Sequence, residues 1–428
     1  MCNGSGEFGR RLLSCTDGVA TERICVIMIE VSRFVRGSIL ALLVASASAR
    51  AAEPVPEAPT PDSLHRALAT WSQADREFGF AHWDQVFKSR KVARGAHVHP
   101  LPVGAQLPTF ANGGAGAAEL DRYAAEYKLA GLVVLVDGTI RLQRYGLGHS
   151  AVGRWTSFSM AKSLTSTLVG AAIRDGYIKS VDDPVTQYIA GLRGSAYEGV
   201  SIRQLLTMTS GVKWNEDYTD LKSDVALFYE TPPDPGVDAT VSYMRRLGRE
   251  APPGTKWSYK TGETNLIGVL VEEATHKSLA AYLSEKIWGP YGMEQDASWE
   301  LDVTSHEQGG CCFQATTRDF ARVGQFILEG TFVNGRPVVA AGWLEAATRK
   351  QADINVPGRG YGYQWWTRDD DTFDAIGIHG QMIHVDPRRK LVVAINSAWP
   401  VATGKEQSAA RVQLINTIAA AIDAEARR

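Results

Sequence analysis

The chain has 428 residues, of which 44% are hydrophobic and 21% are charged, and its formal net charge is -2. This composition is ordinary for a globular protein, and the length favours two structural lobes over one compact core. The nearly balanced charge provides no broad basic surface, so the sequence gives no indication of nucleic-acid binding.

The stretch that begins at Met28 has the pattern of a secretory signal peptide. Arg33 and Arg36 precede a short apolar run, which is followed by small residues typical of a cleavage site. We therefore interpret residues 1–27 as an over-extended start and residues 28–51 as the signal peptide. A long amino-terminal region of the signal is the alternative. A cleaved signal predicts a periplasmic or secreted protein with no stable membrane anchor.

Only two cysteines, Cys311 and Cys312, follow the predicted signal peptide. Two cysteines are too few to form a framework of disulfides in the mature chain. Adjacent cysteines do not reach relaxed disulfide geometry without local strain. We therefore expect two small buried thiols, and a vicinal disulfide is the alternative.

Residues 52–118 are interpreted as a linker rich in proline and alanine followed by an accessory amino-terminal segment, and residues 119–428 as one domain. Near the start of this domain, two β-rich runs flank Asp137-Gly138, which is a strong hairpin signal. A second pair of runs flanks residues 386–389, close to the carboxyl end.

The domain ends in a predicted helix from Arg411 to Ala426, with apolar residues at helical spacing. Strands therefore come first and last. The fold class that we predict is α/β (α+β), with an antiparallel sheet from residues 119–155 and 360–428 flanked by helices, and an all-helical lobe at about 175–345.

Ser159 and Lys162 stand three residues apart at the predicted first turn of a buried helix, which ends near Asp175-Gly176. A lysine among apolar neighbours loses hydration, and its pKa falls. The neutral amine can then take the proton of the serine hydroxyl, while the positive end of the helix favours an oxyanion. A capping serine with a surface lysine is the alternative.

A second Ser-x-x-Lys, from Ser210 to Lys213, shows that the pattern alone is weak, and we interpret this copy as structural. Tyr259 lies in a loop before a predicted helix from about Glu263, where its phenol can face a cleft and relay a proton. A nearby cation is expected to ease its deprotonation. Packing in the core is the alternative.

Four motifs occur in one order: Ser159-Met160-Ala161-Lys162, LLTMTSGVKW, PPGTKWSYKTGETNLIGV and IHGQMIHVDPRRKLVVAINSA. Together they resemble the serine β-lactamase-like superfamily, on the branch of class C β-lactamases, DD-peptidases and family VIII esterases. Within it the chain looks most like 6-aminohexanoate-dimer hydrolases. The resemblance covers roughly Glu119 to the carboxyl end. It implies the β-lactamase/transpeptidase-like fold, an acyl-enzyme on Ser159, and Tyr259 as the catalytic tyrosine.

Two departures from this family pattern concern substrate binding. The usual Tyr-x-Asn reads Tyr259-Lys260-Thr261, and the Lys/His-Thr-Gly strand near the carboxyl end has no lysine. The Lys-Thr-Gly triplet at Lys260 precedes a helix, so we interpret it as a decoy. His379 either replaces the missing cation or is a packed histidine. A backbone N–H at Ile378 or His379 is expected to complete the oxyanion hole.

The stretch from Trp214 to Asp220 is the remaining candidate for substrate contact. In the dimer-hydrolase branch a tyrosine on the corresponding loop contacts the substrate amide, which makes Tyr218, with Trp214 beside it, the candidate here. The acidic residues of the loop either favour an amine-bearing substrate or form a solvated face, and we favour the latter. Trp365 and Trp366 either line the pocket or pack in the core, and we favour packing in the core.

The resulting prediction is a serine hydrolase of a small-molecule amide or ester. A β-lactamase or DD-peptidase is one alternative, and a non-catalytic ligand-binding protein on the same fold is another. His97 and His99 are too few for a metal site without further ligand motifs, so no metal and no cofactor is implied. The absence of Gly-x-Ser-x-Gly argues against an α/β-hydrolase. Nothing in the sequence indicates the oligomeric state.

Overall fold

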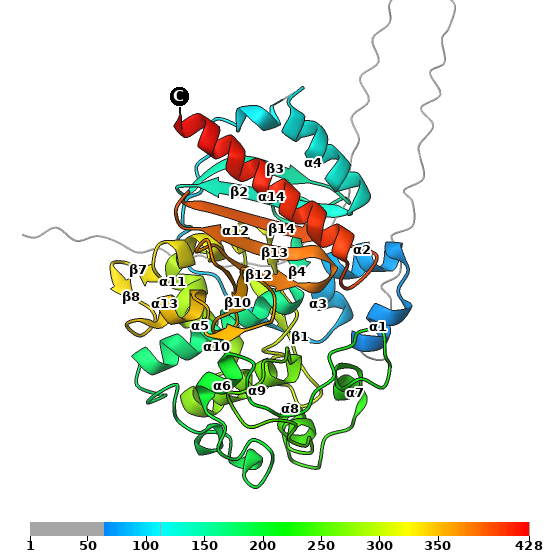
Figure 1. The fold of residues 1–428 in the computed structure, drawn as a ribbon, viewed down its shortest axis with the longest axis vertical. Helices are drawn as coiled ribbons and strands as arrows, with labels where there is room; N and C mark the ends of the chain where they lie inside the picture. Colours follow the sequence, from blue (N-terminus) through cyan, green and yellow to red (C-terminus); the bar gives the residue numbers. More distant parts are fainter. Residues whose placement is uncertain (1–63, 112, 428) are drawn as a thin grey trace, which may run out of the picture. The chain divides into compact units, whose positions relative to one another are not determined.

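The computed structural model describes residues 64–111 and 113–427 (Figure 1). The predicted over-extended start and signal peptide lie outside these residues. Within the described part, we find no helix with the length and apolar character needed to span a membrane.

An eight-stranded antiparallel sheet forms the centre of the fold, in the order β3-β2-β14-β13-β12-β11-β10-β9. Its first hairpin pairs with the strand that precedes the last helix, for example through Val134 opposite Val393. This confirms the antiparallel sheet built from both ends of the domain. The strands are β2 (Leu129–Val136), β3 (Thr139–Tyr145), β9 (Ala352–Asp353), β10 (Arg359–Tyr361), β11 (Trp366–Arg368), β12 (Phe373–Gly377), β13 (Gln381–Asp386) and β14 (Leu391–Ser397).

The two predicted hairpins are present. β2 and β3 are joined by Asp137 and Gly138, whose φ angles of +48° and +73° are both positive, as a two-residue turn that matches the strand twist requires. β13 and β14 form the second hairpin.

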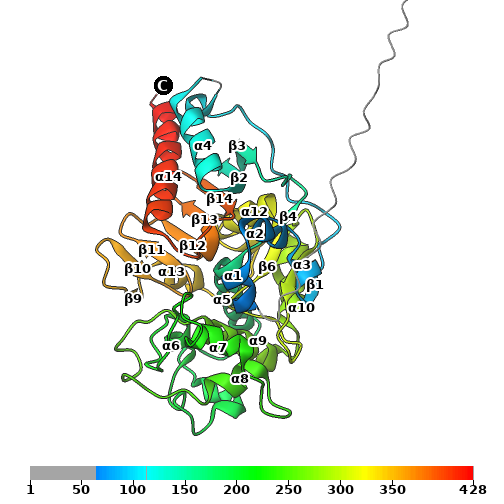
Figure 2. The ribbon, with the colours of Figure 1, turned by 90° about the vertical axis from the view of Figure 1, so that its right-hand side faces the viewer.

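Alternate residues of the central strands are buried on opposite faces of this sheet. Leu132 and Val393 pack beneath α4 (Ala115–Glu126) and α14 (Lys405–Ala426), whereas Val133 and Val392 belong to the larger core on the other face. Figures 1 and 2 show α4 and α14 side by side over one face, with α12 (Thr317–Leu328) behind the sheet. Both faces are covered, so the central strands β2, β13 and β14 are buried along almost their whole length.

A second, four-stranded sheet has the order β1-β5-β6-β4. Its strands are β1 (Ser89–Val92), β4 (Arg154–Thr156), β5 (Ala297–Glu300) and β6 (Phe313–Thr316). The accessory segment contributes β1 together with α1 (Leu64–Thr70), α2 (Gln73–Ala81) and α3 (Trp83–Val86). The prediction of an all-helical region at 175–345 was therefore wrong in part, because β5 and β6 lie within it and pair with strands outside it.

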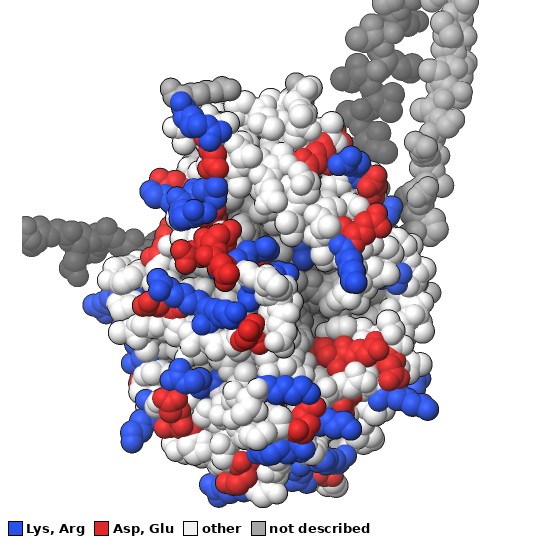
Figure 3. All heavy atoms as spheres, viewed as in Figure 1, with Lys and Arg blue, Asp and Glu red and all other residues white. Residues whose placement is uncertain are grey.

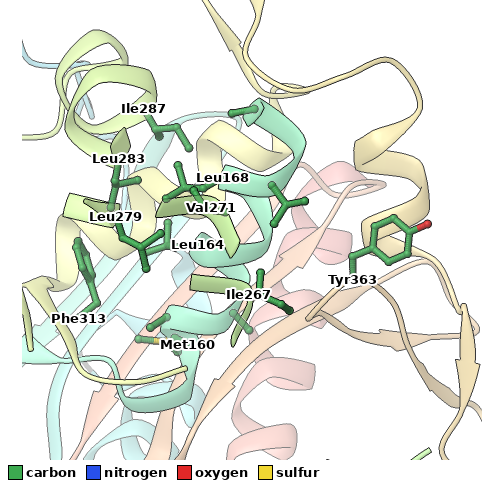
Figure 4. Packing of buried hydrophobic residues seen from close by; sticks show 14 of the residues in the cluster. Met160, Leu164, Leu168, Ile267, Val271, Leu279, Leu283, Ile287, Phe313 and Tyr363 are labelled. Atoms are coloured by element: carbon green, nitrogen blue, oxygen red, sulfur yellow. The ribbon is translucent and has the colours of Figure 1, made fainter. Parts of the chain in front are cut away.

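The helices between the two ends of the large sheet form one apolar core with it. Figure 4 shows Met160, Leu164 and Leu168 facing Ile267 and Val271 of α9. The helices of this region are α5 (Ala161–Arg174), α6 (Ile202–Leu206), α7 (Asp224–Glu230), α8 (Ala239–Met244), α9 (Thr261–Thr275), α10 (Leu279–Leu283), α11 (Gly289–Tyr291) and α13 (Trp343–Thr348). The packing of α5 on α9 brings together the loops that carry Ser159 and Tyr259.

Candidate active site

Ser159 lies in a short 3₁₀ turn, Phe158–Met160, directly before α5. The sequence predicted the first turn of the helix itself, and the structure places the serine just ahead of it. Phe158 has a φ of +43°, in the left-handed region that non-glycine residues rarely adopt. Strained backbone of this kind persists where the surrounding packing fixes it. Here it holds a serine that is 8% exposed at the edge of a cavity.

Lys162, the second residue of α5, points back to Ser159. Its Nζ lies 3.0 Å from Ser159 Oγ, 3.0 Å from Thr261 Oγ1 and 2.6 Å from the Gly310 carbonyl oxygen. The side chain is 1% exposed. Burial lowers the pKa of Lys162 to about 7, and the Glu216 carboxylate opposes part of this effect. A large fraction of the amine is therefore neutral near pH 7 and can accept the proton of the Ser159 hydroxyl.

Tyr259 completes this cluster from the loop before α9. The Lys162 Nζ lies 5.1 Å from the centre of its ring, which stacks on Trp366 at 5.5 Å, and Tyr259 and Ser159 line the same cavity. Burial and then Glu216 raise the pKa of Tyr259 above its usual value. The expectation that a cation would ease its deprotonation was therefore wrong. The phenol keeps its proton at neutral pH.

Glu216 organises the groups around Thr261, a role that the sequence patterns did not predict. Its carboxylate accepts hydrogen bonds from the Thr261 N–H (2.9 Å), the Thr261 hydroxyl, the Tyr218 hydroxyl (2.6 Å) and the Trp214 indole. The acidic loop had been interpreted as a solvated face. The only sequence feature that pointed to Glu216 was its position two residues from each of two aromatic residues, Trp214 and Tyr218.

Thr261 is a second group whose contacts the sequence did not predict. It stands at the third position of the Tyr-x-Asn pattern and belongs to the triplet interpreted as a decoy, yet its hydroxyl contacts both Lys162 and Glu216. The second Ser-x-x-Lys makes no such contact. Ser210 donates to the buried Glu263, and Lys213 is exposed.

Two cavities meet at Ser159, and both are lined by Tyr218 and Ile378. The first is narrow and mostly apolar, and its other lining residues are Leu68, Phe158, Val225, Tyr229, Thr261 and Cys311. The second has a volume of about 210 Å³, and its other lining residues include Tyr259, Trp366, Trp399, Ser408 and Arg411. Trp366 lines this cavity, so of the two placements considered for it the less favoured one is observed. Two cavities on one serine suit a substrate with a group on each side of the scissile bond.

Ile378 and His379 are neighbours in sequence but differ in placement. Gly377 lets β12 come close to the backbone before Ser159, because a Cβ there would lie 2.3 Å from the Ser157 carbonyl oxygen. Ile378 therefore reaches the cavity. His379 has a φ of +56°, is 2% exposed and does not line either cavity.

The surroundings of His379 are those of a packed histidine. Its Nδ1–H donates to the Trp399 carbonyl (2.8 Å), and its ring contacts Phe80 and Phe158. Burial lowers the pKa of His379 to about 4, so the ring is neutral at pH 7. Of the two possibilities left open by the sequence, the geometry favours packing over a cationic role.

Cys311 and Cys312 form a vicinal disulfide, in contrast to the expected pair of thiols. Cys312 has a left-handed backbone, with a φ of +67°. Cys311 faces the apolar cavity, and the preceding residue, Gly310, supplies the carbonyl that contacts Lys162. In the described part of the chain, no group of three or more histidine, cysteine or acidic side chains is arranged to hold a metal ion.

Comparison with known proteins agrees with this geometry. The β-lactamase family model matches residues 117–416. A 6-aminohexanoate-dimer hydrolase of Paenarthrobacter ureafaciens is 29% identical over 350 residues, which cover 78% of this chain and 88% of that protein.

Solved structures show the same fold. A Bacillus anthracis protein described as a candidate 6-aminohexanoate-dimer hydrolase has a TM-score of 0.70 and 23% identity, covering 81% of this chain and 94% of that one. A family VIII carboxylesterase has a TM-score of 0.54 and 16% identity, covering 73% and 98%. The family model spans well over half of the sequence, and the chain therefore belongs to the β-lactamase family of serine hydrolases.

Proposed function

We propose that the protein hydrolyses an amide or ester of a small molecule through a covalent acyl-enzyme on Ser159. The observation that carries this proposal is the buried Lys162 amine, 3.0 Å from Ser159 Oγ, whose pKa is lowered to about 7 by burial. A serine hydroxyl needs such a base to become a nucleophile at neutral pH. A structural lysine would instead keep its charge at the surface.

The positions of these side chains support the following steps. Ser159 Oγ attacks the carbonyl carbon, and its proton passes to Lys162 Nζ. The carbonyl oxygen, now negative, is stabilised by backbone N–H groups at Ser159 and Ile378. The C–N or C–O bond then breaks, and Tyr259, which keeps its phenolic proton, donates to the leaving group and is reprotonated from Lys162. Water attacks the ester on Ser159 by the reverse proton path and releases the acid.

For the substrate we propose linear amides of the 6-aminohexanoate-dimer type, with simple esters as alternative substrates. The support is the similarity to the Paenarthrobacter ureafaciens hydrolase along most of both chains. The narrow apolar cavity beside Ser159 also suits an unbranched methylene chain.

The test is intact-mass spectrometry after brief exposure to a short-chain p-nitrophenyl ester, with p-nitrophenol release followed in parallel. We expect one acyl adduct that maps to Ser159 and is absent in Ser159→Ala. Ser210→Ala is the matched control, because Ser210 belongs to the second Ser-x-x-Lys and should leave the adduct intact. If neither an adduct nor labelling by a fluorophosphonate probe is seen, the protein is a binding module and the proposal fails.

A further inference from the structure

A short turn that begins at Gln308 leads into the Cys311–Cys312 disulfide and lies against the proposed base. The Cys311 N–H donates to the Gln308 carbonyl (3.0 Å), which closes the turn. The Gly310 carbonyl within this turn accepts the hydrogen bond from Lys162 Nζ (2.6 Å). The proposed mechanism uses neither cysteine, so the place of this disulfide beside the base needs a separate explanation.

The same segment is bonded to the turn that carries Ser159. The Cys312 N–H donates to the carbonyl of Phe158, the residue directly before Ser159 (3.3 Å). The N–H of Phe313 donates to the Ser157 hydroxyl (3.0 Å), and its carbonyl accepts from the Ser157 N–H (2.7 Å). Neighbouring residues of one segment therefore bind the base and the nucleophile turn at the same time.

The residues on either side of the disulfide are anchored. The Gly310 N–H donates to Asn265 Oδ1 (2.7 Å), and a Cβ at Gly310 would lie 2.8 Å from the Thr261 carbonyl oxygen, so this end packs tightly on α9. Figure 4 shows Phe313, the first residue of β6, among the apolar side chains of the main core. Only the two cysteines separate these anchors. Their conformation therefore sets the position of the Gly310 carbonyl relative to the nucleophile turn.

The disulfide constrains this backbone locally and contributes little to global stability. Stabilisation by a disulfide grows with the length of the loop that it closes, and adjacent residues close the shortest loop. The bond instead closes a small ring around the peptide bond between the cysteines, which restricts the backbone torsions within that ring. Cys312 has a φ of +67°, which non-glycine residues rarely adopt. Backbone of this kind persists where its surroundings constrain it, and the ring is such a constraint.

The pair can be reached through the cavity beside Ser159. Cys312 is fully buried, whereas Cys311 lines this narrow and mostly apolar cavity. Figure 3 shows acidic and basic side chains interspersed over one face of the molecule, and on that face no broad field of one sign would steer a charged reductant. An uncharged dithiol is therefore the reductant suited to this site.

We propose that the Cys311–Cys312 disulfide is a positioning element of the active site, which holds Lys162 and the Ser159 turn in register, and that reduction of this bond lowers turnover. The proposal rests on the proposed function, because that function assigns Lys162 and Ser159 their roles as base and nucleophile.

Reduction by a dithiol takes place in two exchanges. One sulfur of the dithiol forms a mixed disulfide with Cys311 and releases Cys312 as a thiol. The second sulfur then displaces Cys311 and closes the oxidised dithiol into a ring. The protein gains two hydrogens, and the dithiol loses two.

Reduction frees the torsions that place the Gly310 carbonyl. A displacement of about 1 Å in a catalytic group can lower turnover by about 100-fold, so we expect kcat to fall by about 10- to 100-fold. Lys162 also loses an acceptor that favours its ammonium form, so its pKa should fall. The other groups around this amine, Thr261, Tyr259 and the Glu216 carboxylate behind Thr261, lie on other segments.

The test compares oxidised wild type, wild type reduced with dithiothreitol, and the double variant Cys311→Ser/Cys312→Ser. Peptide mass mapping after thiol alkylation establishes the state of the pair, and the reductant is removed before a p-nitrophenyl ester is added. We expect kcat to fall in reduced wild type and to recover on reoxidation, with little change in melting temperature. The double variant should show the same fall.

The double variant treated with dithiothreitol is the matched control. It keeps the other cysteines of the chain but has no bond at this position, so its kcat should not respond to the reductant. The proposal is overturned if reduced and oxidised wild type have the same kcat, if the untreated pair is alkylated as two thiols, or if kcat falls without a shift in the pH profile. If the bond resists the dithiol, normal kcat in the double variant overturns it; if that variant does not fold, reduced wild type decides.

The failure of the proposed function is recognised separately. In that case oxidised wild type neither turns over an ester nor reacts with a fluorophosphonate probe. The pKa of Lys162 is then measured by NMR on protein with isotope-labelled lysine, and Lys162→Met identifies its signal. A lower pKa in the reduced protein supports the positioning of this lysine by the disulfide, whereas the same pKa in both states overturns it.

Discussion

Replacing Glu216 by glutamine should move the pH dependence of catalysis to lower pH. Lys162 Nζ and the Glu216 carboxylate both bond to the Thr261 hydroxyl, so they lie on the order of 5 Å apart. At an effective dielectric constant of about 20, their attraction is about 3 kcal/mol, which corresponds to about 2 in the pKa of Lys162. The carboxylate favours the ammonium form, and its removal therefore lowers this pKa from about 7 towards about 5.

This prediction differs in sign from a general loss of activity, because kcat/KM at low pH should rise relative to its plateau value. In the proposed mechanism Lys162 acts as a base when neutral, so kcat/KM should rise with pH through the pKa of this lysine in the free enzyme. In Glu216→Gln the rise occurs at lower pH, and the ratio of kcat/KM at pH 6 to its plateau value increases by about 5- to 10-fold. The plateau value of kcat/KM should fall, because the NH₂ group of the glutamine side chain would face the N–H and O–H groups that donate to the Glu216 carboxylate.

The assay is kcat/KM for a p-nitrophenyl ester between pH 5 and pH 9, with Asp217→Asn as the control. Asp217 carries the same charge one residue away, but it bonds only within its own loop, to Thr219. Its substitution should leave the profile in place. The reasoning is refuted if the Glu216→Gln profile coincides with that of wild type, or if the control shifts it equally.

Three further predictions concern separate side chains. Lys162→Ala and Tyr259→Phe should each lower kcat by about 10³-fold or more with an unchanged melting temperature, and near-normal turnover would remove that residue from the mechanism. Burial raises the pKa of Glu300 to about 8, so the folded state loses stability relative to the unfolded state as the pH rises from 4.5, the ordinary pKa of a glutamate, to 8. Glu300→Gln should therefore stabilise the protein more at pH 8 than at pH 5 in urea unfolding, and an equal effect at both pH values would contradict the burial argument. Leu68→Trp should narrow the apolar cavity, seen as a lower kcat/KM ratio of hexanoate to acetate esters; an unchanged ratio would show that substrates avoid this cavity.

The sequence predicted those parts of the fold that depend on local patterns. The hairpin at Asp137-Gly138 follows from a turn that two residues specify, and the spacing of Ser159 and Lys162 follows from helix geometry. The pKa of Tyr259 could not be predicted, because burial and Glu216 outweigh the lysine that the sequence placed beside it. Such a balance depends on side chains that meet only in the folded chain.

Arg411 was predictable in part. The last helix was predicted from Leu414, Ile415 and Ile418, and Arg411 precedes them by three, four and seven residues, which places it on the same apolar face. The predicted helix began at Arg411, whereas α14 begins six residues earlier, at Lys405. The sequence therefore indicated the apolar face of the helix but not the burial of this cation. It did not contain the cavity, because the loop before α14 and β12 lie beside each other only in the tertiary structure.

The segment before the family domain also belongs to the candidate site. The family model begins at residue 117, yet Leu68 lines the apolar cavity, Phe80 contacts the strained Phe158 ring at 4.9 Å, and the Trp83 indole donates to Glu300. The proposed catalytic residues thus come from the shared domain, whereas one wall of a cavity comes from outside it. Relatives with the same Ser159 and Lys162 arrangement can therefore differ in substrate through this wall alone, without any change in the order of their motifs.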